Sequence, residues 1–251
     1  MRHEIIRLKA LMPEAGCRTI AHTFNRRFAE SRQMTVSKTY ANDVIRKNKY
    51  EIQVLRKEIK NRRPKDIPGN LVWGMDLTGK TDTDDNLNHI IGMVEHKSRQ
   101  CLGLAALKDK ASITILRFLL DAVELYGKPR FLRTDNEPLF TSWLFRFSLW
   151  LIGVRHQFID KSCPWQNGRI ERFFGTLKEK LDQWNVISRE QLNDALGQFR
   201  FWYNHVRPHQ NLDGRTPVEV WNGTDVFSRR PKHEYWFEAW DGLLTGIYLK
   251  L

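Results

Sequence analysis

The sequence contains little cysteine and no hydrophobic run long enough to cross a bilayer. Its three cysteines, Cys17, Cys101 and Cys163, are odd in number and far apart, so neither a disulfide framework nor a zinc site is indicated. The most apolar stretch, residues 139–154, is too short to span a membrane and carries Arg146, so we interpret it as a buried helix. The charged N-terminus shows no targeting segment, and these features together favour a reducing cytoplasm.

Patterns typical of nucleophilic enzymes and histidine metal sites are also missing. His89, His96, His156 and His209 lack the spacing of metal ligands, and we assign none of them a catalytic role. No set of Ser, His and Asp and no pair of Cys and His stands out, so the chemistry does not require a protein nucleophile. Internal repeats and low-complexity segments are absent from the sequence.

Positive charge is abundant, and it is concentrated at one end of the chain. The 251 residues carry a net charge of +12, and residues 1–65 alone hold 17 Lys and Arg against 6 Asp and Glu. The remaining residues hold 24 against 23, and a hydrophobic content of 41% is enough to build a packed core. This distribution is typical of a module that neutralises phosphates beside a nearly neutral core, although a solvated basic face is the alternative.

Two helices are predicted within this basic region. Residues 14–29 place apolar side chains at helical spacing, and Ser37 can cap a second helix with Tyr40, Val44 and Ile45 inward. Helices joined in this way indicate a helix-turn-helix, although helical hairpins that only pack together are common. The second helix would enter the major groove of DNA and offer Lys38, Thr39, Asn42 and Arg46 to bases or phosphates. Prolines and a glycine after the basic run 46–65 mark a domain boundary there.

The rest of the chain alternates between strand-like and helical patterns. A mixed α/β domain follows from this order, with a small C-terminal hairpin over residues 235–251 that can pair with another subunit through its edge. In the helix of residues 112–126, we expect Ile113, Leu116, Leu120 and Val123 to form the buried stripe. Strands are expected at 70–78, 89–95, 100–107, 130–135 and 155–159, and helices at 112–126, 139–153, from 167 and from 188.

Three acidic residues follow or begin these elements and form the candidate site. Asp76 and Asp135 each lie at a predicted strand end, and Glu171 lies 35 residues beyond Asp135 at the start of a helix. This spacing also arises by chance, and an isolated Asp76 is more often a turn residue. Three carboxylates that meet at one edge of a sheet, however, repel one another unless a cation neutralises them. Mg²⁺ or Mn²⁺ fits, and two such ions support in-line phosphoryl displacement. We interpret the nearby Asp82, Asp84 and Asp85 as a solvated hairpin tip.

The motifs around these acids resemble a known family. Trp73 with Asp76, Thr134-Asp135-Asn136, Pro164 to Lys178, and a closing block stand in the order seen in bacterial insertion-sequence transposases of the DDE type. These enzymes have a catalytic core of the retroviral-integrase type with an RNase H-like fold. The closing block comprises Tyr203-Asn204, Arg207-Pro208-His209, Leu212 and Thr216-Pro217.

The resemblance implies a function and a residue assignment. It implies hydrolysis at transposon ends and transfer of the freed 3′-hydroxyl into target DNA, with Asp76, Asp135 and Glu171 as catalytic metal ligands and Lys178 contacting DNA. The resemblance covers about residues 60–222 and, weakly, the N-terminal helices. Together with the patterns described above, it predicts a helix-turn-helix module and basic linker over residues 1–65, a core over 66–225 and a β extension over 226–251. The expected partners are double-stranded DNA and further copies of the chain. The expected location is the bacterial cytoplasm, at the nucleoid and not at a membrane.

Two other functions fit the same residues. A metal-dependent nuclease of the same fold would cut DNA without joining it. A catalytically silent DNA-binding protein or regulator, descended from a transposase, would bind DNA without any chemistry that depends on Mg²⁺.

Overall fold

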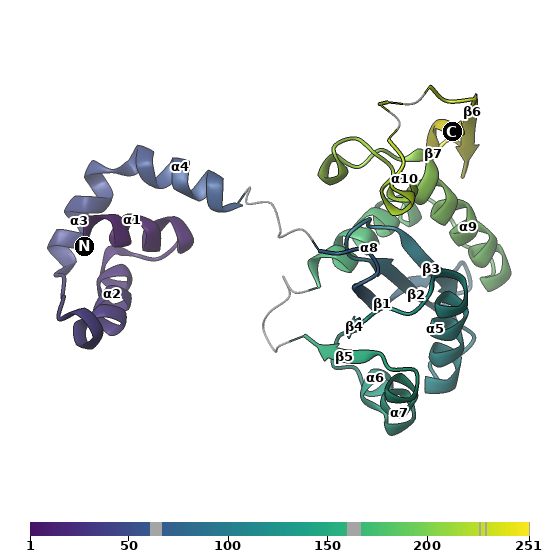
Figure 1. Ribbon diagram of the computed structural model, residues 1–251, viewed down its shortest axis with the longest axis horizontal. Coiled ribbons are helices and arrows are strands. Elements are labelled where there is room, and N and C mark those ends of the chain that lie inside the picture. The colour runs from purple at the N-terminus through teal and green to yellow at the C-terminus, as the bar shows by residue number, and fades with distance from the viewer. Residues whose placement is uncertain (61–66, 160–166, 226, 229, 251) are drawn as a thin grey trace. The chain divides into compact units, whose positions relative to one another are not determined.

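The chain divides into two compact units. The computed structural model describes residues 1–60, 67–159, 167–225, 227, 228 and 230–250. Contacts between Cα atoms separate Met1–Lys65 from Asp66–Leu251, and each unit has a hydrophobic core of its own (Figure 1).

The first unit is a group of helices around a small core. Its helices are α1 (Arg2–Leu11), α2 (Cys17–Arg32), α3 (Lys38–Lys47) and α4 (Lys49–Lys60). Each helix contributes to the core, for example through Ile5, Phe24, Val44 and Ile52. The sequence predicted α2 and α3 but not the charged helices α1 and α4.

The start of α3 confirms the predicted cap and corrects one predicted orientation. The Tyr40 backbone N–H donates to Ser37 Oγ at 3.1 Å, which satisfies one of the free amides of the first turn. The Tyr40 side chain was expected to point inward, but it is 42% exposed, and Ala41 and Val44 fill the core in its place. Ala41 and Val44 lie one turn apart on the face that meets the other helices.

A mixed sheet of five strands forms the centre of the second unit (Figure 1). The strand order is β3-β2-β1-β4-β5, with β1, β2 and β3 antiparallel and β4 and β5 parallel to β1. All five strands were predicted, and β1 runs three residues further than expected because the polar residues up to Thr81 still pair with β2. The strands are β1 (Val72–Thr81), β2 (Leu87–Glu95), β3 (Cys101–Ala106), β4 (Phe131–Thr134) and β5 (Arg155–Phe158).

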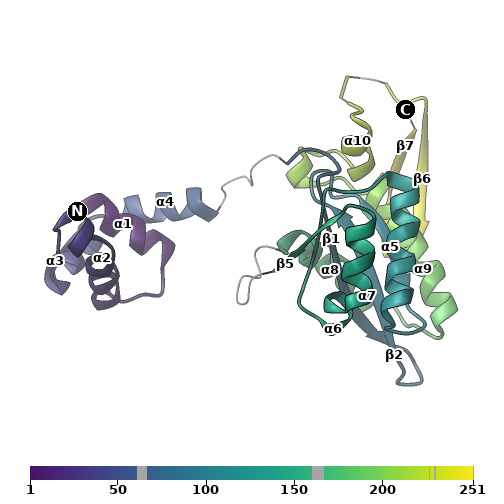
Figure 2. The same ribbon diagram turned by 60° about the horizontal axis from the view of Figure 1, so that its bottom comes forward.

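Helices cover both faces of this sheet, so the predicted mixed α/β architecture is confirmed (Figure 2). Side chains alternate along β2, so Ile91 and Met93 pack on one face while Ile90 and Val94 pack on the other. The first face is covered by α5 (Ser112–Tyr126), α6 (Pro138–Thr141) and α7 (Trp143–Leu151). The second is covered by α8 (Gly168–Leu181) and α9 (Arg189–Phe201).

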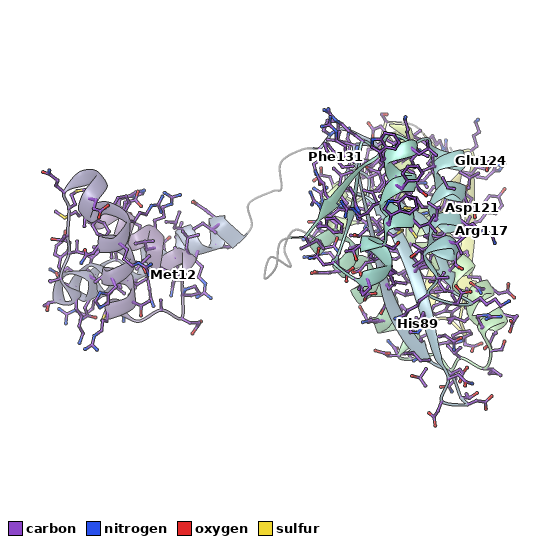
Figure 3. The ribbon with its side chains drawn as sticks, turned by 90° about the horizontal axis from the view of Figure 1, so that it is seen from below. Met12, His89, Arg117, Asp121, Glu124 and Phe131 are labelled. Carbon is purple, nitrogen blue, oxygen red and sulfur yellow. The ribbon has the colours of Figure 1, made fainter. Side chains whose placement is uncertain are left out.

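The buried side of helix α5 is rotated relative to the predicted one, so partly different residues face the core. Ile113 and Leu120 are 45% and 38% exposed, so the expected stripe is wrong at these two positions. Arg117, Asp121 and Glu124 line the exposed side of the helix (Figure 3). The residues buried in α5 are Ile115, Leu116, Leu119 and Ala122.

The apolar segment 139–153 is neither one helix nor fully buried, and both expectations are corrected. Ser142 has an extended backbone between α6 and α7, and its Oγ accepts the Phe145 N–H at 3.3 Å as the cap of α7. Phe145 and Leu149 are buried, but Trp143 and Trp150 are 75% and 72% exposed. Helix α7 therefore has an apolar outer face as well as an apolar inner face.

The C-terminal segment completes the second unit. Short helices η2 (Trp202–Val206), η3 (Gln210–Leu212) and α10 (Pro217–Asn222) lead to the predicted hairpin of β6 (His233–Ala239) and β7 (Leu244–Lys250). Trp202 Nε1 donates to the Thr245 carbonyl at 2.9 Å, and the rings of Trp184 and Trp240 stack with centroids 5.1 Å apart. The hairpin therefore packs on the α8 and α9 side of the sheet.

None of the helices in the described residues is both long and apolar enough to cross a membrane.

Candidate active site

The pairing of β1 with β4 brings Asp76 and Asp135 to the same place. Val72, Trp73 and Gly74 are partners of Phe131, Leu132 and Arg133 in parallel register. The offset between partners is constant, so two further steps along both strands place Asp135 beside Asp76. Neighbouring strands lie about 4.8 Å apart, so the two carboxylates share one edge.

Asp76 belongs to the sheet face that α8 covers. Trp73 and Met75 lie in the core under α5, so Gly74 and Asp76 face the opposite side. A Cβ atom at Gly74 would meet the His96 ring at 2.8 Å and Asn167 Oδ1, at the N-cap of α8, at 3.6 Å. Glycine at this position therefore leaves room for the buried His96 ring against β1.

The electrostatics of Asp76 indicate that other carboxylates lie near it. Burial is the largest influence and raises the pKa of Asp76 from 3.8 to about 6, against a hydrogen bond from the Leu77 N–H at 2.8 Å that lowers it. The charges of Asp135, Glu137 and Glu171 raise the pKa further. Both burial and like charge disfavour the ionised carboxylate, which is the condition that a bound cation relieves.

Asp135 follows β4 directly and is followed in turn by a further acid that the sequence analysis did not single out. The Glu137 N–H donates to Asp135 Oδ1 at 3.1 Å, so a tight turn fixes the Asp135 carboxylate. Glu137 is the N-cap of α6, and its charge acts on Asp76. Its position two residues after Asp135 was the only signal in the sequence, and it became informative only with the fold.

Glu171 lies in the first turn of α8 and is exposed, with Lys178 two turns further along the same exposed strip. The buried stripe of α8 contains Ile170, Phe173, Phe174, Leu177 and Leu181. Residues 164–166, which begin the predicted motif before α8, lie outside the described residues. Asp182 closes the exposed strip, where it pairs with Lys80 of β1 at 3.7 Å.

Asn167, the N-cap residue of α8, lies next to Asp76. It is 2% exposed, and its Nδ2 lies 3.5 Å from Asp76 Oδ2, at the limit of a hydrogen bond. Its Oδ1 is buried without a partner among the described residues. The adjacent His96 is buried, and burial together with Arg169, Arg133 and Arg99 lowers its pKa to about 3, so its ring is neutral.

The three candidate carboxylates are ligands that suit a hard divalent cation, but their side chains are not close enough together to form a complete metal site. Asp76, Asp135 and Glu171 supply carboxylate oxygens, which Mg²⁺ and Mn²⁺ prefer. Within the described part of the chain, no three Asp, Glu, His or Cys side chains are close enough together to hold a metal ion. The structure thus brings the three acids to one edge of the sheet without assembling a preformed metal cage.

The acidic loop after β1 has a structural role. Asp82 Oδ1 accepts the backbone N–H groups of Asp84 and Asn86 at 3.0 and 2.8 Å, which is the pattern of an Asx turn. Asp84 and Asp85 are exposed at this hairpin tip, as predicted.

In the first unit, the four predicted DNA contacts lie on the exposed surface of α3. Lys38, Thr39, Asn42 and Arg46 are all exposed, and Arg46 lies 3.8 Å from Asp43 in a loose ion pair. Exposed pairs of this kind contribute little to stability, so they do not hold the arginine in place.

Known proteins resemble the second unit in sequence and in fold. The family model described as integrase core domain matches residues 152–217, a range that includes Glu171 and Lys178. An uncharacterized 39.2 kDa protein of insertion element IS476 from Xanthomonas euvesicatoria is 30% identical over 149 residues, or 59% of this chain and 43% of that protein. An uncharacterized 31.7 kDa protein of insertion element IS407 from Burkholderia multivorans is 25% identical over 61% of this chain and 56% of that protein. The chain thus spans about half the length of these relatives.

The solved structures support the same fold. The catalytic core domain of HTLV-2 integrase, solved in complex with magnesium, superposes with a TM-score of 0.51 at 21% identity and covers 62% of this chain and 99% of that domain. The resemblance to insertion-element proteins with an integrase-type core, drawn above from motifs, is confirmed by these matches.

Proposed function

We propose that this relative of insertion-element transposases is a DDE-type DNA transposase. In this proposal it hydrolyses the DNA at transposon ends and transfers the freed 3′-hydroxyl into target DNA. The observation that supports the proposal best is the parallel register of β1 and β4, which runs toward Asp76 and Asp135, together with the influence of the Asp135 and Glu171 charges on Asp76. The DNA ends, the target DNA and further copies of the chain are the proposed partners.

We assign Asp76, Asp135 and Glu171 as the residues that hold the metal. Two Mg²⁺ or Mn²⁺ ions bound there would activate the attacking oxygen and stabilise the leaving oxygen of an in-line displacement. The chain orients its carboxylates through the Leu77 N–H on Asp76 and the Glu137 N–H on Asp135. Lys178, exposed on the Glu171 strip, is assigned to a DNA phosphate near the reacting bond, and Glu137 is a further acid whose charge acts on Asp76.

The basic first unit supplies DNA binding in this proposal. Residues 1–65 carry a net charge of +11, and α3 exposes Lys38, Thr39, Asn42 and Arg46 together. We assign α3 as the helix that enters the major groove, with these side chains as its contacts.

The decisive experiment compares cleavage and joining in an active-site variant. DNA that flanks the gene supplies the terminal repeats, which are prepared as intact ends and as pre-cleaved ends with a free 3′-hydroxyl. Each kind of end is incubated with the full chain, Mg²⁺ and a target duplex. Asp135→Asn removes one charge at constant shape, so it should abolish cleavage and joining while DNA binding stays nearly unchanged. Asp121→Asn, on the exposed side of α5, is the matched control and should remain active.

The outcomes separate the three candidate functions. Normal joining by Asp135→Asn sinks the metal-site assignment. Cleavage of intact ends without joining of pre-cleaved ends identifies a nuclease of the same fold. Binding of the ends without any reaction that requires Mg²⁺ identifies a silent regulator.

A further inference from the structure

The outer side of α7 carries an exposed cluster of large apolar side chains. We define the α7 aromatic face as Trp143, Leu144, Phe147, Trp150 and Leu151, which all lie on the solvent side of this nine-residue helix. Trp143 and Trp150 are 75% and 72% exposed. The inner residues Phe145 and Leu149 anchor α7 to the core. Exposed apolar patches of this kind mark binding sites.

The rings of this face are stacked in a row. Trp143 and Phe147 lie almost parallel, with centroids 5.0 Å apart and planes 9° apart, and Phe147 and Trp150 follow at 5.7 Å and 29°. The spacing of four and then three residues keeps all three rings on one side of the helix. The tryptophans at the two ends of the row leave broad ring surface open to a further flat group.

The surroundings of the row are positively charged. A recess of about 750 Å³ lies against Trp143, Phe147 and Trp150, and the described residues that line it include Arg146 and Arg155 but no acid. The sequence contains no Asp or Glu between Glu137 and Asp160. His156 also lines the recess, but burial and then the charge of Arg146 lower its pKa to about 4, so the two arginines supply the charge near neutral pH.

This combination favours an anionic, aromatic occupant over a second copy of the chain. A two-fold contact through α7 would bring the arginines of two copies together, and the segment offers no acid to neutralise them. Stacked aromatic rings beside cationic side chains are the features that bind single-stranded nucleic acid, because each base has a flat face and each nucleotide a negative charge.

We propose that the α7 aromatic face binds unpaired nucleotides of a DNA strand next to the reacting end, with bases against Trp143 and Trp150 and phosphates near Arg146 and Arg155. This inference rests on the proposed function, since it takes DNA as the substrate. The face lies on the α5 side of the sheet, yet it is linked to the candidate site. His156 of the recess lies 2.9 Å, at its Nε2, from the hydroxyl of Thr134, the residue that precedes Asp135.

The test measures the affinity of the full chain for two DNA probes without catalytic metal. One probe is a labelled blunt duplex, and the other is the same duplex with a few unpaired nucleotides at one end. Trp150→Ala should weaken binding of the second probe by about 5- to 150-fold for each stacked base that is lost, with the blunt duplex unchanged. Trp150→Phe keeps a ring and should restore most of the difference.

The control is Leu125→Ala, which removes a side chain on α5 that is equally exposed, at 72%, and lies outside the face. It should bind both probes as the unmodified chain does. The proposal is overturned if Trp150→Ala binds both probes normally or loses affinity for both equally. It is also overturned if Trp150→Ala changes only the sedimentation of the protein, since a second copy is then the occupant.

Failure of this inference can be distinguished from failure of the proposed function. If the unmodified chain neither cleaves nor joins DNA in Mg²⁺ but Trp150→Ala still selectively weakens the overhang probe, the transposase assignment fails and the binding face stands. If cleavage and joining occur and Trp150→Ala binds both probes normally, the transposase assignment stands and the proposed binding face fails.

Discussion

Replacing Asp76 by asparagine should stabilise the protein at neutral pH when no metal is present. The pKa of the Asp76 carboxyl is raised from 3.8 to about 6 in the folded chain, mainly by burial. Well below pH 3.8 the carboxyl is protonated in the folded and unfolded states alike, so it has no effect. As the pH rises from about 4 to 6, the unfolded state releases the proton while the folded state retains it, so the stability of the native chain falls. Above pH 6 the loss is complete.

The magnitude follows from the size of the shift. A change of one pKa unit corresponds to about 1.4 kcal/mol, so the shift from 3.8 to about 6 predicts that Asp76→Asn gains up to about 3 kcal/mol at pH 8. The Leu77 N–H can still donate to the asparagine oxygen, so that hydrogen bond is retained. Added Mg²⁺ should reverse the order, because a bound cation favours the ionised carboxylate that only the native chain has.

Urea unfolding in EDTA, followed by tryptophan fluorescence between pH 4 and 8, measures the effect. All nine tryptophans lie beyond residue 66, so the signal reports the second unit alone. Asp121→Asn, on the exposed side of α5, is the control and should track the native chain at every pH. A difference between Asp76→Asn and the native chain that stays constant from pH 4 to 8 refutes the reasoning, as does a native chain that gains stability over that range.

Three further predictions concern packing, capping and charge. Gly92→Ala should lower the free energy of unfolding, measured in urea, by about 1–3 kcal/mol, because the new Cβ would meet Phe174 Cζ at 2.8 Å. Gly197→Ala, whose new Cβ would have no atom within 4 Å, should raise it by up to about 1 kcal/mol through α9. Destabilisation by both substitutions, or by neither, contradicts this packing argument. Ser37→Ala should accelerate hydrogen exchange in α3 by an amount equivalent to about 1 kcal/mol and leave the tryptophan unfolding curve unchanged; unchanged exchange contradicts the cap. Lys38→Ala should reduce the slope of log affinity against log salt for DNA by about 0.9, and an unchanged slope removes Lys38 from the phosphate contacts.

The sheet could be predicted from the sequence because each strand is a short apolar run with clear ends. Segments such as 89–95 and 130–135 carry that signal locally, and they coincide with β2 and β4 within two residues. The parallel pairing of β1 with β4 has no local signal, since it joins segments separated by β2, β3 and α5. The proximity of Asp76 and Asp135 therefore remained a hypothesis until the fold was known, and Glu137 could not be distinguished from any other acid.

The apolar segment around α7 shows where residue type misleads. Tryptophan, leucine and phenylalanine predict burial on average, so residues 139–154 were expected in the core. No glycine or proline marks the break at Ser142, which is visible only as an extended backbone between two helices. Periodicity also could not distinguish the two apolar sides of α7. A residue that is exposed for binding has the same sequence signal as one that is buried for stability.

The three candidate acids are not held with equal stiffness. Asp76 and Asp135 are tied to strands joined by backbone hydrogen bonds, so substitutions in the core alter their separation little. Glu171 is carried by α8, which rests on the sheet through the contact of Phe173 and Phe174 with Gly92. A helix that packs through aromatic rings on a glycine shifts more easily than two strands joined by backbone hydrogen bonds change their register. The mechanical freedom of the site is therefore concentrated in one helix, and core substitutions beneath α8 should alter the metal affinity of the site more than those beneath α5.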